Sequence, residues 1–186
     1  MYQINILLIA LLIASCNSSN TKQTDFTGKS QEQASKTSTS YGKHSFAMLR
    51  TMHGNITFKF YPEDAPNTVH RFIALAKSGF YTGVIFHRVI PNFVVQGGDP
   101  TGTGRGGSGK KLKAEFNSRI HIKGAVAMAR SQDFDSADSQ FYIALNTLPH
   151  LDGKYTVFGQ VVEGWEALDK IKKGDKIISI TIEHRK

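Results

Sequence analysis

The sequence predicts a mostly-β domain in which short strands form a closed barrel and two helices cover its openings. The 186-residue chain contains 17 glycines and 12 phenylalanines, a composition typical of a protein with many turns and an aromatic core. Apolar and polar residues alternate in several short segments, as they do in strands with one buried face. Closure into a barrel removes exposed strand edges, so we expect these strands to close on themselves.

The first residues predict an export signal. Residues 6–13 form an unbroken apolar run, which is too short to span a bilayer and typical of the core of a signal peptide. The run ends in the sequence IASC at residues 13–16, which resembles the bacterial lipobox, a small-residue cleavage site before a cysteine that becomes acylated. We therefore expect a lipoprotein signal peptide over residues 1–15 and a mature chain that begins at a lipidated Cys16.

Residues 16–40 are expected to form the lipidated cysteine and a flexible linker. The linker is rich in Ser, Thr, Gln and Lys and nearly free of large apolar side chains, so it cannot bury enough surface to become ordered. Cys16 is the only cysteine, which makes a disulfide within the chain impossible. We place the folded domain at residues 41–186 and the protein in the cell envelope, held on a membrane by its lipid anchor.

Short strands are expected along most of the folded domain. Residues 56–60 and 178–182 alternate phenylalanine or isoleucine with polar side chains, which indicates two strands with one buried face each. Buried strands are also expected at residues 125–129 and 141–145. A further strand is expected at residues 154–162, directly after an Asp-Gly turn.

Two helices are expected between the strands. Within residues 64–79, four apolar side chains recur at helical spacing, and Pro66 falls in the first turn. Asp64 is the expected N-cap, and Gly79 is expected to end the helix. A second, shorter helix is expected over residues 163–172.

Residues 81–98, with the sequence YTGVIFHRVIPNFVVQGG, resemble the signature of the cyclophilins, a family of peptidyl-prolyl cis-trans isomerases. The resemblance continues through GDPTGTGRGGSG at residues 98–109, SQFYI at 139–143 and HLDGKYTVFGQV at 150–161. It implies that family's fold, an eight-stranded antiparallel β-barrel with a helix over each end. It also implies the family's activity, which is rotation of X-Pro peptide bonds without a cofactor, at a site on the outer wall of the barrel.

The same resemblance implies roles for individual residues. It makes Arg88 the catalytic residue. The residues that it implies for substrate binding surround the proline ring and the adjoining peptide chain: His87, Phe93, Val94, Gln96, Ala129, Arg130, Tyr142, His150 and Leu151.

Three of these positions carry further expectations. Tyr142 stands where phenylalanine is common; its hydroxyl can point outward, so we expect the pocket to keep its function. His150 stands where many members have a tryptophan associated with cyclosporin binding, so we expect weak inhibition by that drug. His87 is one step from Arg88 on a strand and faces the other way, which favours a hydrogen-bonded structural histidine over a base.

The chemistry explains why this reaction uses an arginine beside an apolar pocket. An X-Pro amide resists rotation, with a barrier of ~20 kcal/mol, because its nitrogen shares a lone pair with the carbonyl. In the twisted transition state the lone pair is localised on nitrogen, so a cationic donor there stabilises the transition state more than the ground state. An apolar pocket excludes water and strengthens this interaction. No nucleophile, metal or proton transfer is needed.

Two sequence patterns that suggest other chemistry are incomplete. Residues 104–111 are close to a phosphate-binding loop, but Lys111 replaces the hydroxyl that holds magnesium. Asp133, Asp135 and Asp138 resemble the start of a calcium loop, but Ala144 occupies the position of its bidentate glutamate. We therefore expect neither a nucleotide nor a metal.

The formal charge of +8 leaves other partners open, because basic proteins bind nucleic acids and anionic surfaces. Export makes nucleic acid an unexpected partner. Two rivals to an enzyme remain: a tethered receptor or chaperone that binds proline-containing segments without turnover, and an envelope protein whose basic face contacts an anionic polymer. We expect a monomeric enzyme that acts on proline-containing segments of folding exported proteins, since a pure binder does not need Arg88.

The lipobox leads to a first testable prediction. Intact mass spectrometry of the protein from its native host should show a chain that begins at Cys16 and carries acyl chains, and this chain should partition into detergent. Cys16→Ser should lack the acyl mass. An unmodified product of residues 1–186 would contradict the expected anchor.

Overall fold

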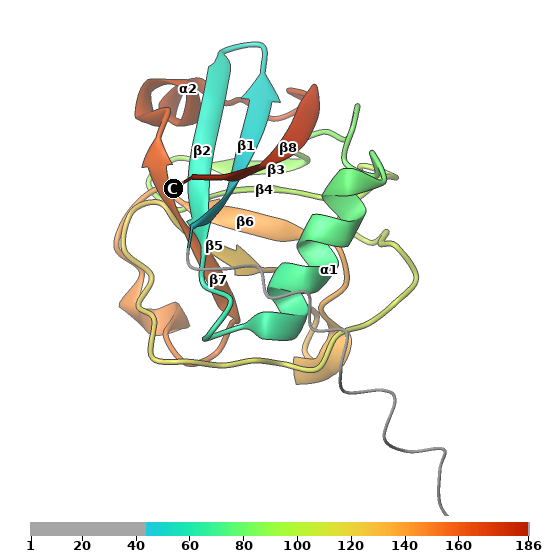
Figure 1. Cartoon of the computed structure of the whole chain (residues 1–186), viewed down its shortest axis with the longest axis vertical. Helices are drawn as coiled ribbons and strands as arrows, with labels where there is room; N and C mark the ends of the chain where they lie inside the picture. The colour runs from blue at the N-terminus through green and yellow to red at the C-terminus, as the bar shows by residue number, and fades with distance from the viewer. Residues whose placement is uncertain (1–43, 186) are drawn as a thin grey trace, which may run out of the picture. The chain divides into compact units, whose positions relative to one another are not determined.

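The computed structural model describes residues 44–185, and its main feature is one curled sheet of eight strands (Figure 1). The sheet has the order β3-β4-β6-β5-β7-β2-β1-β8, and all neighbouring strands are antiparallel. The predicted signal peptide, Cys16, the whole predicted linker and the first three residues of the predicted domain lie outside the described residues. No helix among residues 44–185 is long and apolar enough to cross a membrane.

The elements follow one another in the order that the sequence predicts. The strands are β1 (Ser45–Thr51), β2 (Gly54–Phe60), β3 (Arg88–Ile90), β4 (Val94–Gly97), β5 (Ala125–Met128), β6 (Phe141–Ala144), β7 (Val157–Glu163) and β8 (Ser179–His184). The two α-helices are α1 (Pro66–Lys77) and α2 (Trp165–Lys170). Two short 3-10 helices, η1 (Phe134–Ser136) and η2 (Pro149–Leu151), lie between strands. The mostly-β fold with two helices is thus confirmed.

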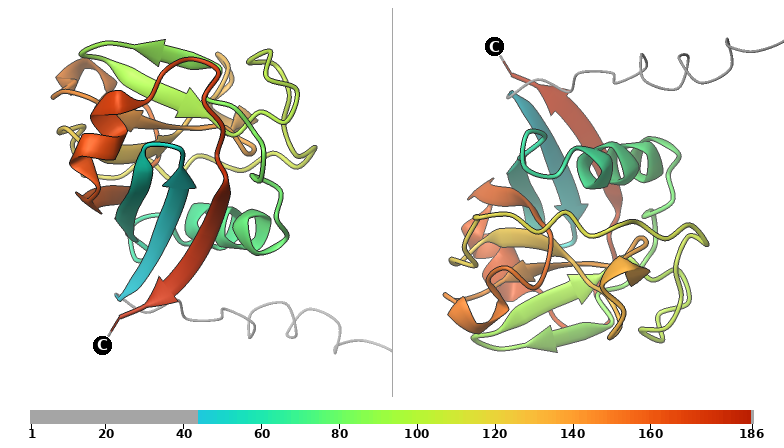
Figure 2. Two further views of the ribbon diagram at one scale, coloured as in Figure 1. Left: turned by 90° about the horizontal axis from the view of Figure 1, so that it is seen from above. Right: turned by 90° about the horizontal axis from the view of Figure 1, so that it is seen from below.

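The edges of the sheet, β3 and β8, are not joined by a strand ladder within residues 44–185. The segments that lead into these strands do meet, because Gly83 N donates to Ile177 O at 2.8 Å and Ile177 N donates to Val84 O at 2.9 Å. Figure 2 shows from two sides how strongly the sheet curls, with α1 beside β8. The structure therefore shows a curled sheet, and closure of the barrel stays a prediction.

Aromatic rings fill the space between α1 and the sheet. The ring of Phe72, on α1, lies 5.6 Å from that of Phe58 on β2, 5.3 Å from that of Phe141 on β6 and 5.0 Å from that of Tyr81. The pairs with Phe58 and Phe141 are edge-to-face and the pair with Tyr81 is stacked, and such aromatic pairs add stability beyond the burial of their area. The aromatic core that the composition predicts is present, and it fixes α1 on the inner face of the sheet.

The alternating strands agree with the prediction at β2 and only in part at β8. Ile56, Phe58 and Phe60 are all buried, with 0 to 2% exposure. The predicted strand at residues 178–182 begins one residue later, at Ser179, and Ile178 is exposed. The backbone of Ile178 is held by Arg50 O, so this residue belongs to the approach to the strand and not to its buried face.

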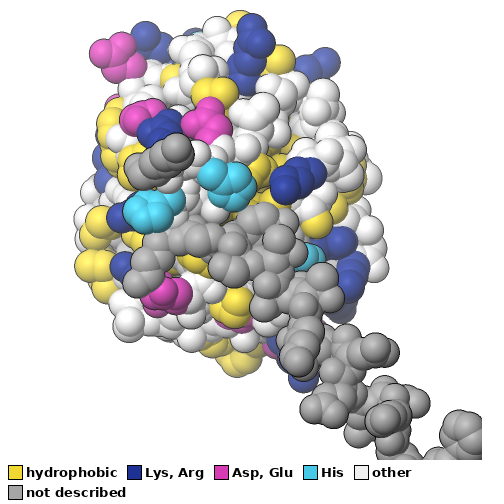
Figure 3. Space-filling model, in the orientation of Figure 1, with side chains coloured by type: hydrophobic (Ala, Val, Ile, Leu, Met, Phe, Trp, Pro, Cys, Tyr) yellow, Lys and Arg dark blue, Asp and Glu magenta, His cyan; other side chains and the backbone are white. Residues whose placement is uncertain are grey.

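Basic side chains are spread over one face of the domain. On the face shown in Figure 3, Lys and Arg side chains lie among apolar and uncharged ones and do not gather in one patch. The excess of positive charge is therefore distributed on this face.

The first turn of α1 differs from the prediction in how it is capped. Asp64 is not the N-cap: that position is taken by Ala65, which has no side chain able to cap. The carboxylate of Glu115, from the segment between β4 and β5, accepts hydrogen bonds from Asn67 N at 2.9 Å and Thr68 N at 2.8 Å. A distant residue thus satisfies backbone donors that the local sequence leaves unpaired.

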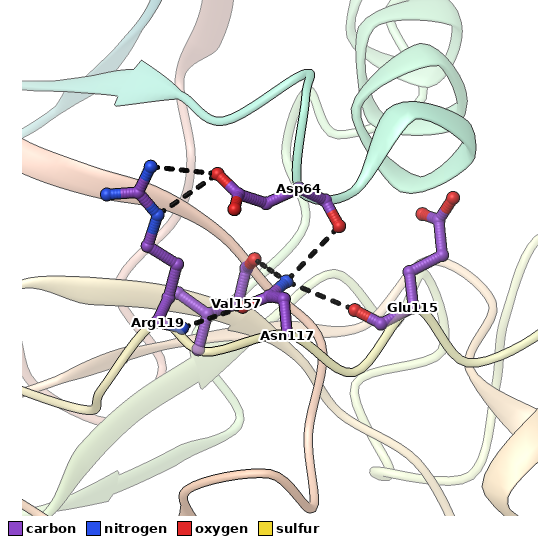
Figure 4. A network of polar contacts seen from close by, with 5 residues as sticks. All are labelled: Asp64, Glu115, Asn117, Arg119 and Val157. Atoms are coloured by element: carbon purple, nitrogen blue, oxygen red, sulfur yellow. Dashed lines mark hydrogen bonds and ion pairs between the residues drawn. The ribbon is translucent and has the colours of Figure 1, made fainter.

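Asp64 instead anchors the segment that carries Glu115 (Figure 4). Its carboxylate accepts from Arg119 Nε at 3.0 Å and Nη2 at 2.9 Å. Asn117 Nδ2 donates to Val157 O at 2.9 Å and also contacts Asp64 O at 3.4 Å. These contacts fix the segment between the start of α1 and β7.

The Glu115 cap predicts a measurable contribution to stability. Glu115→Ala removes a charged acceptor at a helix N-terminus and should lower the free energy of unfolding by about 1–2 kcal/mol. Glu115→Gln, which keeps one acceptor oxygen but no charge, should lose less. Urea unfolding of the three proteins measures both losses, and equal stability of the Ala variant and the unaltered chain would contradict the cap.

Candidate active site

Strands β4, β5 and β6 direct alternate side chains to opposite faces of the sheet. Val95, Val126 and Ile143 belong to the main core. Their neighbours Val94, Ala127 and Tyr142 belong to a second apolar cluster on the other face. Because successive side chains of a strand point in opposite directions, the same three strands build the core and the floor of a site outside it.

A pocket of about 110 Å³ opens over this second cluster. Its lining combines apolar side chains with two arginines and an amide: Arg88, Phe93, Val94, Gln96, Ala129, Arg130, Tyr142, Leu151 and Tyr155. Eight of the ten residues that the sequence implied for the site are therefore brought together. His87 and His150 are outside the lining, and Tyr155 was not expected.

One row of paired residues runs across four strands and passes under the pocket. Arg88 on β3 pairs with Gln96 on β4, Gln96 pairs with Tyr142 on β6, and Tyr142 pairs with Ala127 on β5. Cross-strand partners lie directly beside one another on one face of a sheet. The register of the sheet thus sets Arg88, the amide of Gln96 and the ring of Tyr142 side by side.

Arg88 is exposed but held in position. Its Nη1 donates to Gln96 Oε1 at 3.2 Å, and its guanidinium carbon lies 5.4 Å from the ring centre of Phe93. Gln96 Nε2 in turn donates to Gln140 Oε1 at 3.0 Å. Gln140 Nε2 donates to the carbonyls of Gly104 and Gly106 at 3.0 and 2.8 Å. A chain of amides therefore connects Arg88 to the glycine-rich loop.

His87 lies on the buried side of Arg88, as its position on the strand predicts. It is 9% exposed and lies beside Gly104. The predicted hydrogen-bonded role is wrong, because neither ring nitrogen has a hydrogen-bond partner among the described residues. Burial is the main effect and lowers the pKa of His87. The nearby charge of Asp99 raises this pKa to a smaller extent, and that of Arg88 lowers it. His87 is therefore neutral near pH 7 and does not reach the pocket.

His150 supports the pocket from outside. Its ring stacks on that of Phe93, with centroids 5.9 Å apart and an interplanar angle of 11°. It is carried by η2, which also supplies Leu151 to the lining. The contact with substrate that the resemblance implied for His150 stays a prediction.

The hydroxyl of Tyr142 does not point outward, although the sequence left that orientation open. The side chain is 4% exposed, and the hydroxyl lies 2.9 Å from Nε2 of His121. Burial is the main cause that raises the pKa of Tyr142, so the phenol keeps its proton. His121 is fully buried, and sequence reasoning missed it because it lies in none of the segments that carry the family resemblance.

Arg130 closes the pocket beside Tyr155. Its guanidinium donates to Lys154 O through Nε at 3.0 Å and Nη2 at 2.8 Å, and to Ser131 O through Nη1 at 2.8 Å. The guanidinium carbon lies 4.6 Å from the ring centres of both Phe134 and Tyr155. The arginine side chain is thus part of the wall, fixed by carbonyls and aromatic rings.

A larger hollow of about 440 Å³ adjoins the pocket. The two share Gln96, Ala129 and Arg130. The rest of its lining comes from the glycine-rich loop with Arg105, from Lys111, and from the polar side chains of Ser131, Ser136, Asp138 and Gln140. A peptide whose proline ring occupies the pocket would therefore have room for neighbouring residues beside it.

The acidic residues that resemble a calcium loop have structural contacts. Asp133 caps η1, and Asp135 accepts from Ala114 N at 2.9 Å. Asp138 accepts from Ser108 N and Gly109 N at 2.9 and 2.8 Å. Within residues 44–185, no group of three or more His, Cys, Asp or Glu side chains is placed to hold a metal ion.

Comparison with known proteins decides the family. Residues 46–184 match the family described as cyclophilin type peptidyl-prolyl cis-trans isomerase/CLD. The chain belongs to the cyclophilins. The predicted family and the predicted enzyme class, an isomerase, are confirmed.

Relatives agree in sequence and in fold. A peptidyl-prolyl cis-trans isomerase of Helicobacter pylori is 47% identical over 142 residues, which cover 74% of this chain and 86% of the relative. Peptidyl-prolyl cis-trans isomerase B of Bacillus subtilis is 47% identical over 130 residues, or 69% of this chain and 90% of the relative. The crystal structure of a cyclophilin type isomerase of Cryptosporidium parvum is similar with a TM-score of 0.72 and 31% identity, and the match covers 76% of this chain and 99% of that one.

The pocket geometry predicts that Phe93 supports binding and rate together. Phe93→Ala removes a half-buried ring that carries apolar contact and excludes water beside Arg88, so kcat/KM should fall by roughly 30-fold, equivalent to about 2 kcal/mol of apolar contact. Both KM and kcat should change in exchange NMR with an Ala-Pro peptide. Phe46→Ala, which removes a half-buried ring from β1, is the matched control and should keep the activity.

Proposed function

We propose that this cyclophilin catalyses cis–trans rotation of X-Pro peptide bonds in exported proteins and thereby assists their folding. The observation that carries the proposal is the placement of the Arg88 guanidinium at the rim of an apolar pocket that can take a proline ring. Membership of the cyclophilins supports the reaction. The export signal in the sequence supports the class of substrate.

The pocket supplies the first half of the catalysis. Phe93, Val94, Tyr142 and Leu151 surround the ring site with apolar surface. A pyrrolidine ring held there stays fixed while the peptide on its other side turns. Water is excluded from the site, and the field of a neighbouring charge is stronger in such surroundings.

Arg88 supplies the second half. A guanidinium has five N–H donors, and within residues 44–185 Arg88 uses one of them to donate to Gln96. The remaining donors are available to hold a substrate carbonyl and to approach the proline nitrogen, whose lone pair becomes localised as the bond twists. Gln96 fixes the arginine before substrate arrives, so little reorganisation is needed during the reaction.

The substrate is proposed to be an extended proline-containing segment. The hollow next to the pocket provides space for residues beside the proline. A structure of the Cryptosporidium parvum relative was determined in the presence of the dipeptide Ala-Pro, which supports a short proline-containing ligand here.

We further propose that the enzyme works in the cell envelope as a monomer, attached to a membrane by an acylated Cys16 and without nucleic acid as a partner. The lipobox supports the anchor.

A binding module that holds proline segments without turnover remains the rival function. Pocket residues such as Phe93 and Leu151 would serve both functions equally. The exposed, pre-positioned Arg88 favours the enzyme because its interaction strengthens only as the amide twists.

Substitution of Arg88 separates the two functions. Arg88→Ala should lower kcat/KM by about 10²–10³-fold, as expected for the loss of one charge-assisted interaction in the transition state, while peptide affinity falls far less. Arg88→Lys should recover little, since a point charge cannot reproduce the planar fork. Exchange NMR on an Ala-Pro peptide measures the rate and titration measures affinity.

Arg50→Ala, which removes an exposed arginine from β1, is the control and should leave kcat/KM unchanged. If Arg88→Ala kept more than about a third of the activity, less than ~1 kcal/mol of transition-state binding would be lost. The catalytic assignment would then be wrong, and the binding module would replace it.

A further inference from the structure

A buried histidine lies behind the wall of the proline pocket. His121, in the segment before β5, is fully buried and has polar partners on both ring nitrogens. Its Nε2 lies 2.9 Å from the hydroxyl of Tyr142, and its Nδ1 lies 2.8 Å from Oδ1 of Asp152. The imidazole stacks against the Tyr142 ring, with centroids 6.0 Å apart and planes 14° from parallel.

The chemistry of these partners fixes where the protons are. Hydrogen bonds from the His121 backbone and ring lower the pKa of Asp152, so its carboxylate is ionised near pH 7 and can only accept. Nδ1 of His121 must therefore carry a proton and donate it. A neutral imidazole then has a bare Nε2, which accepts from the hydroxyl of Tyr142. The direction of donation is Tyr142 to His121 to Asp152.

This chain of hydrogen bonds joins two walls of the pocket that are remote in sequence. Tyr142 comes from β6, whereas Asp152 directly follows η2, the turn that carries Leu151. The backbone of His121 is held by the same turn: its N–H donates to Asp152 Oδ1 at 2.7 Å, and its carbonyl accepts from Leu148 N at 2.7 Å. The imidazole thus lies between the two walls and contacts both.

We propose that His121 is a positioning residue of this isomerase: as a neutral imidazole it fixes the Tyr142 ring and the turn bearing Leu151, and its protonation disrupts the pocket. The inference rests on the proposed function. In this role His121 holds the pocket wall in an acid-sensitive way and does not touch the substrate.

The surroundings of His121 act on its protonation in both directions, and burial has the largest effect. Tyr155 presents its ring edge to the imidazole at 6.5 Å. Burial is the largest effect and lowers the pKa of His121 below its ordinary 6.5; Asp152 opposes this shift, and His150 adds to it. The positive charge of Arg130 lowers the pKa of Tyr142, but this effect is smaller than that of burial. His121 is therefore neutral at pH 7 and gains its second proton only as the pH falls below 6.5.

Protonation has a defined structural consequence. Nε2 of His121 becomes a donor, so the Tyr142 hydroxyl can no longer donate to it and must turn around to accept. The hydroxyl proton then has to find another acceptor in a site where Tyr142 is 4% exposed. An unpaired buried donor is costly, so the ring moves from its position in the pocket wall, and kcat/KM falls as the pH decreases.

The test compares pH profiles of kcat/KM for an Ala-Pro peptide, measured by exchange NMR on the full chain. The unaltered protein should lose activity as the pH falls from 7 through the pKa of His121, by about tenfold in all, a loss of the size expected for one hydrogen bond. His121→Gln, which cannot take up a proton, should have about tenfold lower activity at neutral pH and a flat profile over this range. Tyr142→Phe alters the pocket wall, so only the shape of its pH profile is compared. This variant should also lose the acid dependence.

A matched control and a measurement on the unaltered protein complete the test. His53→Gln removes a second histidine–aspartate pair, in which His53 Nε2 lies 2.8 Å from Asp175, and should keep both activity and acid dependence. NMR titration of the imidazoles gives the pKa of His121, which should coincide with the kinetic inflection. This measurement does not require any variant to fold, and it distinguishes His121 from His150.

Each outcome bears on one proposal. If the unaltered protein is inactive at every pH, the proposed function is wrong. If it is active but His121→Gln keeps the same acid dependence, or if the kinetic inflection follows His150, the positioning role of His121 is overturned.

Discussion

The site depends on the cross-strand row that places Arg88, Gln96, Tyr142 and Ala127 side by side on four neighbouring strands. The next row, one residue along each strand, faces the main core with Val95, Val126 and Ile143. A slip of one residue in any of these pairings would exchange the two rows. The apolar core therefore fixes the register, and the register fixes which side chains meet outside the sheet.

In the proposed reaction the Arg88 guanidinium must be in position before the substrate binds. The glycine-rich loop helps to hold it there through Gln140 and Gln96. Asp99 is fully buried and accepts from Thr101 N at 2.7 Å and Gly104 N at 2.6 Å. Burial alone would raise the pKa of Asp99, but these hydrogen bonds lower it, so the carboxylate stays charged. A Cβ on Gly106 would lie 2.1 Å from Asp99 Oδ1. The loop thus keeps the shape that offers its carbonyls to Gln140.

The sequence was sufficient for the parts of the site that are encoded locally. Residues 81–98 contain Arg88, Phe93 and Gln96 within one segment, so a single resemblance predicts their roles and the pleat of the strands predicts that His87 faces away. The same holds for the buried face of α1, where Phe72 follows the helical period. In these cases spacing along the chain and position in space are directly related.

Contacts between distant segments could not be predicted in this way. Asp64 was expected to cap α1 because it has the right residue type at the right place, but Glu115 performs this role from 48 residues away. His121 gave no signal, since its partners Tyr142 and Asp152 are 21 and 31 residues distant. Packing decides which of several polar side chains reach such positions, and it also turned the hydroxyl of Tyr142 inward.

The cap formed by Glu115 also limits how this protein can evolve. The segment between β4 and β5 has no regular secondary structure apart from one isolated bridge, and segments of this kind normally tolerate insertions and deletions. Here one stretch provides the carbonyls that hold Gln140, the cap of α1, and His121. A change in length that displaced any of these three would disturb the site or the first turn of α1, so this irregular segment is constrained at several points along its course.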